Sequence, residues 1–459
     1  MSTANVLRWA VAITMTNFAA IGPAHGQAAG SSTPAAMTGG DIAQPAAPET
    51  WTIHAQATFV VQAHPSFHSA SRGANSLDPG AHAAETADIT LYAGARLWRG
   101  TEIWINPEID QGFGLSNTIG VAGFLSGEAY KIGAKTPYLR LHRFFIRQTI
   151  DLGGEPQRLD ADLNQLAGAR SANRVVVTVG KFSVGDVFDQ NVYAHDPRND
   201  FFNWAVIEAG SFDYAADAWG YTAGGAVELY QGRFVARAGA FLTSNVPNSE
   251  LIDTRFRQYQ LVGEIEHAHM LFGQPGKLRL TGFVTRADQA KFQQALDLAR
   301  IAGGLPDLVP LRRFASRPGV SLNLEQAITF QLGLFARAGY ADGSQESFDF
   351  TDIDRTVLGG VSFKGKGWGR SGDTIGLAGV VNGASRVRQA FLAAGGLGIL
   401  IGDGALRHAS DEHIIEVYYD IGLAKGAHVA LDYQWVENPG YNRDRGPVSA
   451  LALRVHSQF

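Results

Sequence analysis

The stretch WTIHAQATFVVQA, residues 51–63, decides the fold class. Every odd position from Trp51 to Ala63 is apolar, whereas nearly every even position from Thr52 to Gln62 is polar. A period of two places alternate side chains on opposite faces of a β-strand. The stretch therefore predicts a long strand with one apolar face and one polar face.

The same alternation recurs along the chain. It is clear in residues 101–110 and again in residues 427–436, where Leu431 and Trp435 oppose Asp432. The sixteen candidate strands fall at 51–63, 86–98, 101–110, 138–152, 174–184, 219–231, 233–243, 258–271, 277–288, 318–325, 329–341, 353–363, 372–382, 412–424, 427–436 and 448–459. An even number of amphipathic strands is compatible with an antiparallel sandwich or with a closed barrel.

Strand length and loop length separate these two folds. Sandwich strands are typically about five or six residues long, whereas a tilted strand needs about nine to eleven residues to cross a bilayer. Several of the candidates are longer than that. Short connections, at 99–100, 231–232 and 425–426, alternate with long ones, at 64–85, 111–137, 185–218, 289–317 and 383–411. The sequence therefore predicts an all-β, transmembrane antiparallel β-barrel of about sixteen strands, with short periplasmic turns and long extracellular loops.

The composition fits a barrel whose outer face lies in lipid. Only 18% of the 459 residues are charged, the chain has no cysteine, and the mean hydropathy is −0.05. Beyond the N-terminal region there is no predominantly apolar run of about eighteen residues, which excludes helical spans. The net charge of −5 argues against a nucleic-acid partner, which would require a strong basic excess.

No catalytic motif competes with this interpretation. The sequence lacks a G-x-S-x-G nucleophile elbow, an H-E-x-x-H zinc motif and a Walker A loop. The absence of cysteine excludes thiolate metal ligands and a cysteine nucleophile. We therefore expect a protein that is not an enzyme and that carries no cofactor and no bound metal.

The two ends of the chain predict export and membrane assembly. Residues 1–26 have the layout of a cleaved signal peptide, with an apolar core that ends at a small-residue site. Residues 27–50 are rich in Ala, Pro and Ser and predict a flexible tether, which leaves residues 51–459 as a single barrel domain. The last strand ends on Phe459, which resembles the C-terminal signature read by the barrel-assembly machinery. We expect the mature protein in the outer membrane of a Gram-negative cell.

The polar face of the strands predicts a lumen of mixed charge. In residues 138–152, Phe144 and Ile146 point to lipid, so Arg143 and Arg147 point inward. The same reasoning places these further charged side chains in the lumen: Arg237, Glu108, Glu264, Glu266, Glu416 and Asp432. Guanidinium donors and carboxylate acceptors together can hold vicinal hydroxyl groups, and aromatic rings suit sugar faces. Charges of both signs can also serve only to solvate or brace the wall, and the pattern does not choose between these roles.

Several stretches of the chain resemble the carbohydrate-selective porins of the OprB type. They are GKFSVGDVFDQNVYAHDPRNDFFNWA at 180–205, AADAWGYTAGGAVEL at 215–229, SLNLEQAIT at 321–329, LGLFARAGYADG at 332–343, GDTIGLAGVVNGAS at 372–385, LAAGGLGILIGDG at 392–404 and NPGYNRDRGPV at 438–448. The resemblance is strongest from Arg143 to Phe459. It implies a monomeric outer-membrane barrel of sixteen strands that passes monosaccharides and small oligosaccharides by facilitated diffusion.

The resemblance also suggests which residues narrow the pore. Arg143 and Arg147 lie in the block that matches the family's arginine-rich strand. The segment DPRNDFFNW, residues 196–204, is similar to the family's inward-folded loop and implies Asp196, Arg198 and Trp204 as further pore-lining candidates. The expected partners are small carbohydrates, outer-membrane lipid and lipopolysaccharide, and the barrel-assembly machinery.

Three functions remain open at this point. The leading hypothesis is a sugar-selective channel with an arginine and carboxylate constriction. The alternative is a general or polysaccharide-exporting channel, whose lumen would carry mainly one sign of charge if its cargo were an acidic polymer. An outer-membrane barrel enzyme is the least favoured, because no Ser/His/carboxylate set is visible near the membrane interface.

Overall fold

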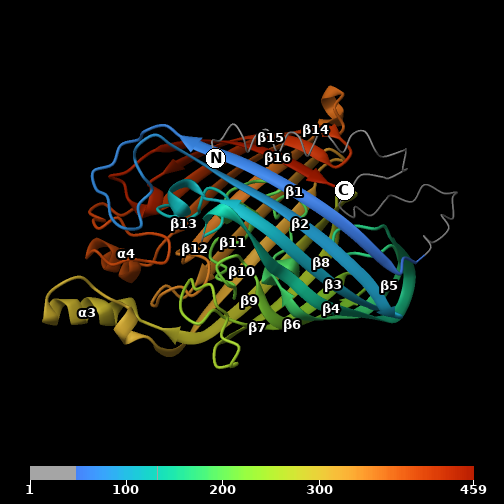
Figure 1. Ribbon diagram of the computed structural model, residues 1–459, viewed down its shortest axis with the longest axis horizontal. Helices are drawn as coiled ribbons and strands as arrows, with labels where there is room; N and C mark the ends of the chain where they lie inside the picture. Colours follow the sequence, from blue (N-terminus) through green and yellow to red (C-terminus); the bar gives the residue numbers. More distant parts are fainter. Residues whose placement is uncertain (1–47, 132) are drawn as a thin grey trace.

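The computed structural model describes residues 48–131 and 133–459, and these residues form a closed barrel of sixteen antiparallel strands (Figure 1). The signal peptide predicted for residues 1–26 and most of the tether lie outside the described residues. The strands are β1 (Trp51–His64), β2 (His82–Trp98), β3 (Thr101–Gly112), β4 (Ala134–Leu159), β5 (Gly168–Phe182), β6 (Thr222–Gln231), β7 (Phe234–Leu242), β8 (Tyr259–Leu271), β9 (Gln274–Gln289), β10 (Arg313–Ala327), β11 (Leu332–Ala341), β12 (Arg355–Lys364), β13 (Thr374–Gly383), β14 (Glu412–Ala424), β15 (Ala427–Glu437) and β16 (Val448–Gln458). The predicted fold class and every predicted strand are confirmed.

The barrel closes where its first strand meets its last. β1 pairs with β16 in a register that sets Phe59 opposite Val455. Beyond β16, the backbone of Phe459 exchanges hydrogen bonds of 2.7 and 2.9 Å with Ala55. Closure leaves no open sheet edge, so the strands satisfy one another's backbone groups within the hydrocarbon.

The outer face of the barrel is apolar, as the alternation predicts. The residues that point outward include large side chains at the middle of the strands that are 40–60% exposed, such as Ile105, Ile146, Leu280, Leu431 and Leu451. A face of this kind would be an aggregation hazard in water and matches the lipid-facing band of a membrane barrel. Among the described residues, no helix is long and apolar enough to cross a membrane.

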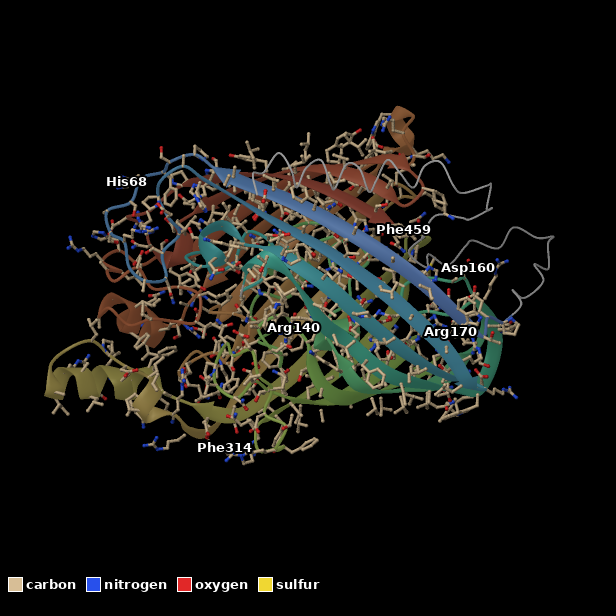
Figure 2. All side chains as sticks on the ribbon, in the orientation of Figure 1. His68, Arg140, Asp160, Arg170, Phe314 and Phe459 are labelled. Atoms are coloured by element: carbon tan, nitrogen blue, oxygen red, sulfur yellow. The ribbon has the colours of Figure 1, made fainter. Side chains whose placement is uncertain are left out.

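The two ends of the barrel differ in the length of the connections between strands. At one end the connections are short, as at 99–100, 232–233 and 425–426. At the other end they are long and hold α3 (Phe292–Ala302) and α4 (Arg386–Ala393), which lie at the left of Figure 1. In Figure 2, Asp160 and Arg170 mark the short-turn end and His68 the opposite end. The short turn predicted at 231–232 is displaced by one residue, because Gln231 still belongs to β6.

The long connections also carry short helical turns. These are η2 (Leu115–Asn117), η3 (Val184–Asp186), α2 (Trp204–Ile207), η4 (Val309–Leu311) and η6 (Pro439–Tyr441), while η5 (Gly365–Trp368) lies in the β12–β13 turn. The helices α3 and α4 fall inside the predicted loops 289–317 and 383–411.

The connection between β5 and β6, residues 183–221, folds into the barrel and fills part of the lumen; we call it the inward loop. Its segment 201–218 is buried throughout. Glu416 on β14 accepts hydrogen bonds from the backbone of Phe202 and Asn203, and Arg337 on β11 donates to the carbonyl of Val206 at 2.8 Å. The inward loop is therefore attached to strands on several sides of the barrel.

Candidate functional site

A β-bulge on β4 brings two basic residues into the lumen side by side. Leu139 and Leu141 are exposed on the outer face, and so is Phe144, three residues later. In the pairing with β3, Asn106 lies opposite Arg143 while Pro107 lies opposite Leu141, so His142 is an extra residue. A bulge of this type shifts the alternation by one residue. Arg140, His142 and Arg143 consequently all point inward, and Arg140 is labelled midway along the barrel in Figure 2.

Arg143 forms a two-pronged ion pair with the inward loop. Its Nε donates to Oδ2 of Asp186 at 2.8 Å, and its Nη2 donates to Oδ1 at 2.6 Å. Asp186 ends η3, where it also accepts from the backbone N–H of Ser183 at 2.9 Å. Burial disfavours the charged carboxylate, but the Arg143 guanidinium holds the pKa of Asp186 below its usual value. The side chain of Arg143 is 15% exposed and that of Asp186 is 28% exposed, so the pair is in contact with water.

Aromatic rings flank this ion pair. The Arg143 guanidinium lies 4.9 Å from the ring centre of Tyr221, and its Nη1 donates to the Tyr221 hydroxyl at 3.4 Å. Three residues before Arg143 on β4, the guanidinium of Arg140 lies 3.4 Å from the ring centre of Trp219. We call Arg140, Arg143, Asp186, Trp219 and Tyr221 the β4 cluster. It combines hydrogen-bonding groups of both signs with flat apolar faces.

A second acidic group extends the β4 cluster. Asp217 lies 3.4 Å from the ammonium of Lys181 and 3.8 Å from the guanidinium of Arg140. Lys181 and Arg140 keep 29% and 27% of their side-chain surface exposed. This part of the wall therefore also presents charge to water.

Arg198 lies in the inward loop among carboxylates of the wall. It donates to Glu108 at 2.9 Å and to Glu128 at 2.9 Å, and lies 3.3 Å from Asp88. Asp196 accepts from the backbone N–H of Arg198 at 2.9 Å, which shapes the turn. Burial opposes ionisation of Asp196, and the charge of Arg198 lowers its pKa. The structure therefore places Arg198 beside Asp196 and makes Arg198, only 9% exposed, the link between loop and wall.

Three predicted wall carboxylates point inward but are covered by other parts of the protein. Glu264 pairs with Arg237 at 2.7 Å and accepts from the backbone N–H of Asp189 at 2.9 Å. Glu416 binds the backbone of the inward loop, as described above, and Asp432 accepts from Gln434 at 3.2 Å. All three carboxylates are at most 3% exposed, and Arg237 is 9% exposed. These side chains face inward, as the strand alternation predicts. Their contacts, however, are with the inward loop and with other wall residues, which they hold in place.

Trp204 and Arg147, the two remaining residues predicted to line the pore, are not part of the β4 cluster. Trp204 does not line the passage: it is 4% exposed, with its ring stacked 5.1 Å from Phe124 and 4.8 Å from Phe350. The pattern could not show this, because the packing partners come from other loops. Arg147 points inward but donates to the carbonyl of Asn164 at 2.9 Å, in the turn after β4. It lies about 13 Å along the strand from Arg143 and is not part of the β4 cluster.

The sequence prediction missed Arg140, Asp186, Trp219 and Tyr221. Arg140 could have been found from the shift between Leu141 and Phe144, because two apolar residues three apart cannot both face lipid in a regular strand. Asp186 lies on the inward loop, where no periodicity reports which way a side chain points. Trp219 and Tyr221 fall in the predicted strand 219–231, but β6 begins only at Thr222, so both belong to the inward loop.

One group of described residues could hold a metal ion. Glu108, Asp110 and His142 each offer a ligand atom, and these atoms lie within 4.8 Å of one another. All three residues are buried on the inner wall beside the β4 cluster.

A closed antiparallel barrel with an apolar exterior, a charged lumen and an inward-folded loop defines an outer-membrane porin. Residues 74–459 match the family model of the carbohydrate-selective porins, OprB family. The chain therefore belongs to the OprB family, whose members are passive channels rather than enzymes.

Solved structures support this fold. The chain is similar to OprB of Pseudomonas putida in its high-pH structure, with 17% identity, a TM-score of 0.68, and coverage of 89% of this chain and 94% of that chain. The low-pH structure of the same protein matches with 13% identity and a TM-score of 0.50, over 89% of this chain and 93% of that one. No curated protein matches the sequence of the chain.

Proposed function

We propose that monosaccharides and small oligosaccharides cross the barrel along the β4 cluster. The observation that carries this proposal is the water-exposed Arg143–Asp186 pair beside the rings of Tyr221 and Trp219. A sugar presents neighbouring hydroxyls at its rim and C–H groups on its faces. A guanidinium and a carboxylate can exchange hydrogen bonds with the rim while an aromatic ring covers a face.

The charge balance of the β4 cluster favours neutral cargo. Arg143 and Asp186 satisfy each other, and Arg140 and Lys181 both lie near Asp217. A lumen selective for ions would present an excess of one sign. The three cations and two carboxylates leave a net charge of only +1, and each has an ionic neighbour, so a sugar mainly exchanges hydrogen bonds and its binding remains weak enough for rapid release.

The proposal includes the route to the membrane and the partners there. We infer that residues 1–26 are removed during export and that the chain acts as a monomer in contact with lipid and lipopolysaccharide. The outward apolar row on β16, with Leu451 at 60% exposure and Phe459 at 57%, is suited to recognition by the barrel-assembly machinery.

Liposome swelling tests the proposal. Vesicles that contain the protein should swell faster in glucose than in a zwitterionic amino acid of matched size. Arg143→Ala should remove this preference, whereas Arg300→Ala should keep it, because Arg300 lies on α3 and its side chain is 69% exposed. Equal swelling rates for both solutes with the unaltered protein would contradict sugar selectivity and leave a general porin.

A further inference from the structure

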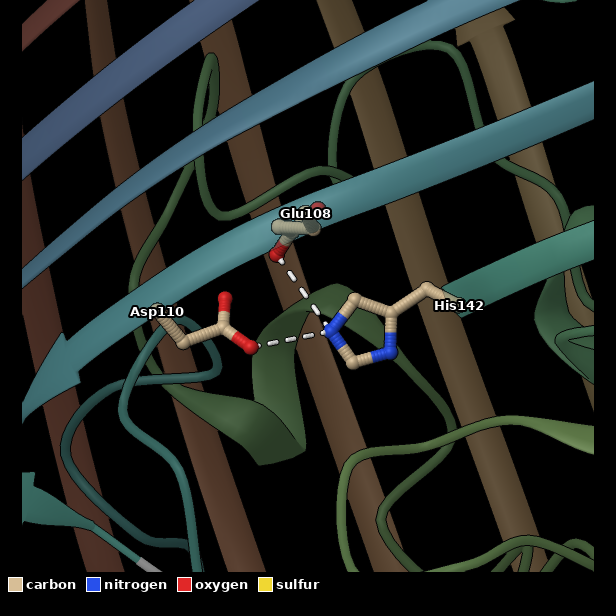
Figure 3. Close-up of side chains that lie close together, drawn as sticks. All are labelled: Glu108, Asp110 and His142. Atoms are coloured by element: carbon tan, nitrogen blue, oxygen red, sulfur yellow. Dashed lines mark hydrogen bonds and ion pairs between the residues drawn. The ribbon is translucent and has the colours of Figure 1, made fainter. Parts of the chain in front are cut away.

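Glu108, Asp110 and His142 form a compact group on the inner wall (Figure 3), and the ring of His142 stacks 4.3 Å from that of Tyr221 in the β4 cluster. Nε2 of His142 lies 3.2 Å from Oδ2 of Asp110 and 3.7 Å from Oε1 of Glu108. The two carboxylates come from alternate positions of β3, and the imidazole comes from the bulge of β4. The bulge is what allows His142 to face them.

These distances suit a small dication. Zinc binds imidazole nitrogen and carboxylate oxygen at about 2.0–2.2 Å. Two ligands of a tetrahedral ion are then separated by about 3.4 Å, a value that follows from those bond lengths. The two distances from His142 lie on either side of this value, so only small side-chain movements are needed to surround an ion.

The surroundings carry an excess of buried negative charge. Asp88 and Glu128 join Glu108 and Asp110, and all four carboxylates are at most 5% exposed. The cations in contact with them are Arg198 and, when protonated, His142. A metal-ligating imidazole is neutral, so Arg198 alone would then face the four carboxylates, and an unpaired buried charge is costly. A divalent ion would offset two of the three uncompensated negative charges.

Unpartnered polar atoms point to the same conclusion independently. Oδ1 of Asp110 has no hydrogen-bond partner although the residue is fully buried, and in Figure 3 it is directed toward Glu108. Neither polar atom of the Asn106 side chain has a partner, and this fully buried residue lies opposite the bulge. Buried polar atoms in proteins are nearly always satisfied, and an ion or its bound water is one way to satisfy them.

We propose that Glu108, Asp110 and His142 bind one divalent transition-metal ion and thereby tie β3 to the bulge of β4. A set of one nitrogen and two oxygen ligands suits Zn²⁺ better than Mg²⁺ or Ca²⁺, which prefer oxygen alone. Arg198 and Thr90, which donate to the two oxygens of Glu108, would hold that carboxylate in place as outer-shell partners. The site requires no assumption about the transported solute.

Isothermal titration of the purified, detergent-solubilised protein with ZnCl₂ tests the proposal. We expect one saturable site per chain, and a rise of more than about tenfold in Kd for Asp110→Asn and for His142→Gln. The matched control is Asp88→Asn, which removes the same charge from the same group without removing a ligand, and its Kd should change less than about threefold. An equal rise in Kd in all three variants, or a Kd for Mg²⁺ equal to that for Zn²⁺, would indicate nonspecific attraction of cations to the acidic residues. Either result would overturn the proposal.

A diffraction experiment makes the test independent of whether the variants fold. Crystals of the unaltered protein grown with ZnCl₂ should show an anomalous peak at the zinc edge between Nε2 of His142 and the carboxylates of Glu108 and Asp110. A peak elsewhere, or none at a zinc concentration that saturates the titration, would contradict the assignment. Both experiments detect the bound metal and not the sugar, so the proposed function stands or falls separately.

Discussion

Nη2 of Arg198, on the inward loop, donates to Oε1 of Glu108, on the wall strand β3, at 2.9 Å. The same guanidinium also donates to Glu128 and lies 3.3 Å from Asp88, so one loop side chain is set among three buried carboxylates. This connection holds the inward loop against the wall and thereby sets the space that remains for a solute.

We expect Arg198→Ala to loosen the inward loop. Removal of one partner from a buried ion pair typically costs about 3–5 kcal/mol, because the remaining charges stay buried without compensation. The single-channel conductance in planar bilayers should rise and become noisier. The matched control is Arg72→Ala, since Arg72 pairs with Asp78 at the surface with 64% of its side chain exposed. Unchanged conductance in Arg198→Ala would show that the loop is held by other contacts.

Asp213 anchors a second long connection. Its carboxylate accepts from Arg317 at 3.0 Å and from the backbone N–H groups of Phe348 and Phe350 at 2.7 and 2.8 Å. Asp213→Asn should lower the free energy of unfolding by about 3 kcal/mol, because the buried Arg317 would lose its nearer charge partner and keep only Asp354, at 3.4 Å. Urea denaturation of the refolded protein measures this. Asp160→Asn, at an exposed position, should have no measurable effect, and an equal loss there would contradict the account.

The charge of Asp200 should make stability depend on pH. Burial, and next the neighbouring Asp196, raise the pKa of Asp200 to about 6. A carboxyl with a raised pKa keeps the proton longer in the folded state, so stability falls as pH rises from about 4 to about 6 and is constant above that. Asp200→Asn should be more stable than the unaltered protein at pH 8, by on the order of 2 kcal/mol after allowance for partial exposure, and nearly equal at pH 3.5. Thermal unfolding at both pH values tests this, and a pH-independent difference would be inconsistent with it.

Because His142 is the extra residue of the bulge, the barrel should still assemble when His142 is deleted. Removal of His142 leaves Leu141 outside and Arg143 inside, so every other side chain of β4 keeps its face. We expect this deletion variant to assemble, as judged by heat-modifiable gel mobility in membrane fractions. Deletion of Ile146 is the control, because it puts one side of β4 out of register with β3 and turns the polar face there, including Arg147, toward lipid. Failure of the His142 deletion with assembly of the Ile146 deletion would refute the bulge assignment.

The fold could be predicted from the sequence because strand alternation is a local property. Ile105 and Glu108 report their faces through their nearest neighbours along the chain, and sixteen such strands leave few architectures. The site could be predicted only in part. Arg143 lies on a strand and was placed correctly, whereas Trp204 lies on the inward loop, and its burial depends on Phe124 and Phe350 from distant loops. Asp186 and Tyr221 were missed for the same reason, since loop contacts are set by the tertiary structure.

The most direct test of the central claim is the block of ion current by glucose in a planar bilayer, with Arg143→Ala compared against the unaltered protein. A hydrogen bond to a charged group is worth about 1.5–3 kcal/mol, so loss of the guanidinium should raise the half-blocking glucose concentration at least about tenfold. Arg300→Ala should leave that concentration unchanged. If glucose blocks Arg143→Ala as well as it blocks the unaltered protein, the β4 cluster is not where the sugar binds.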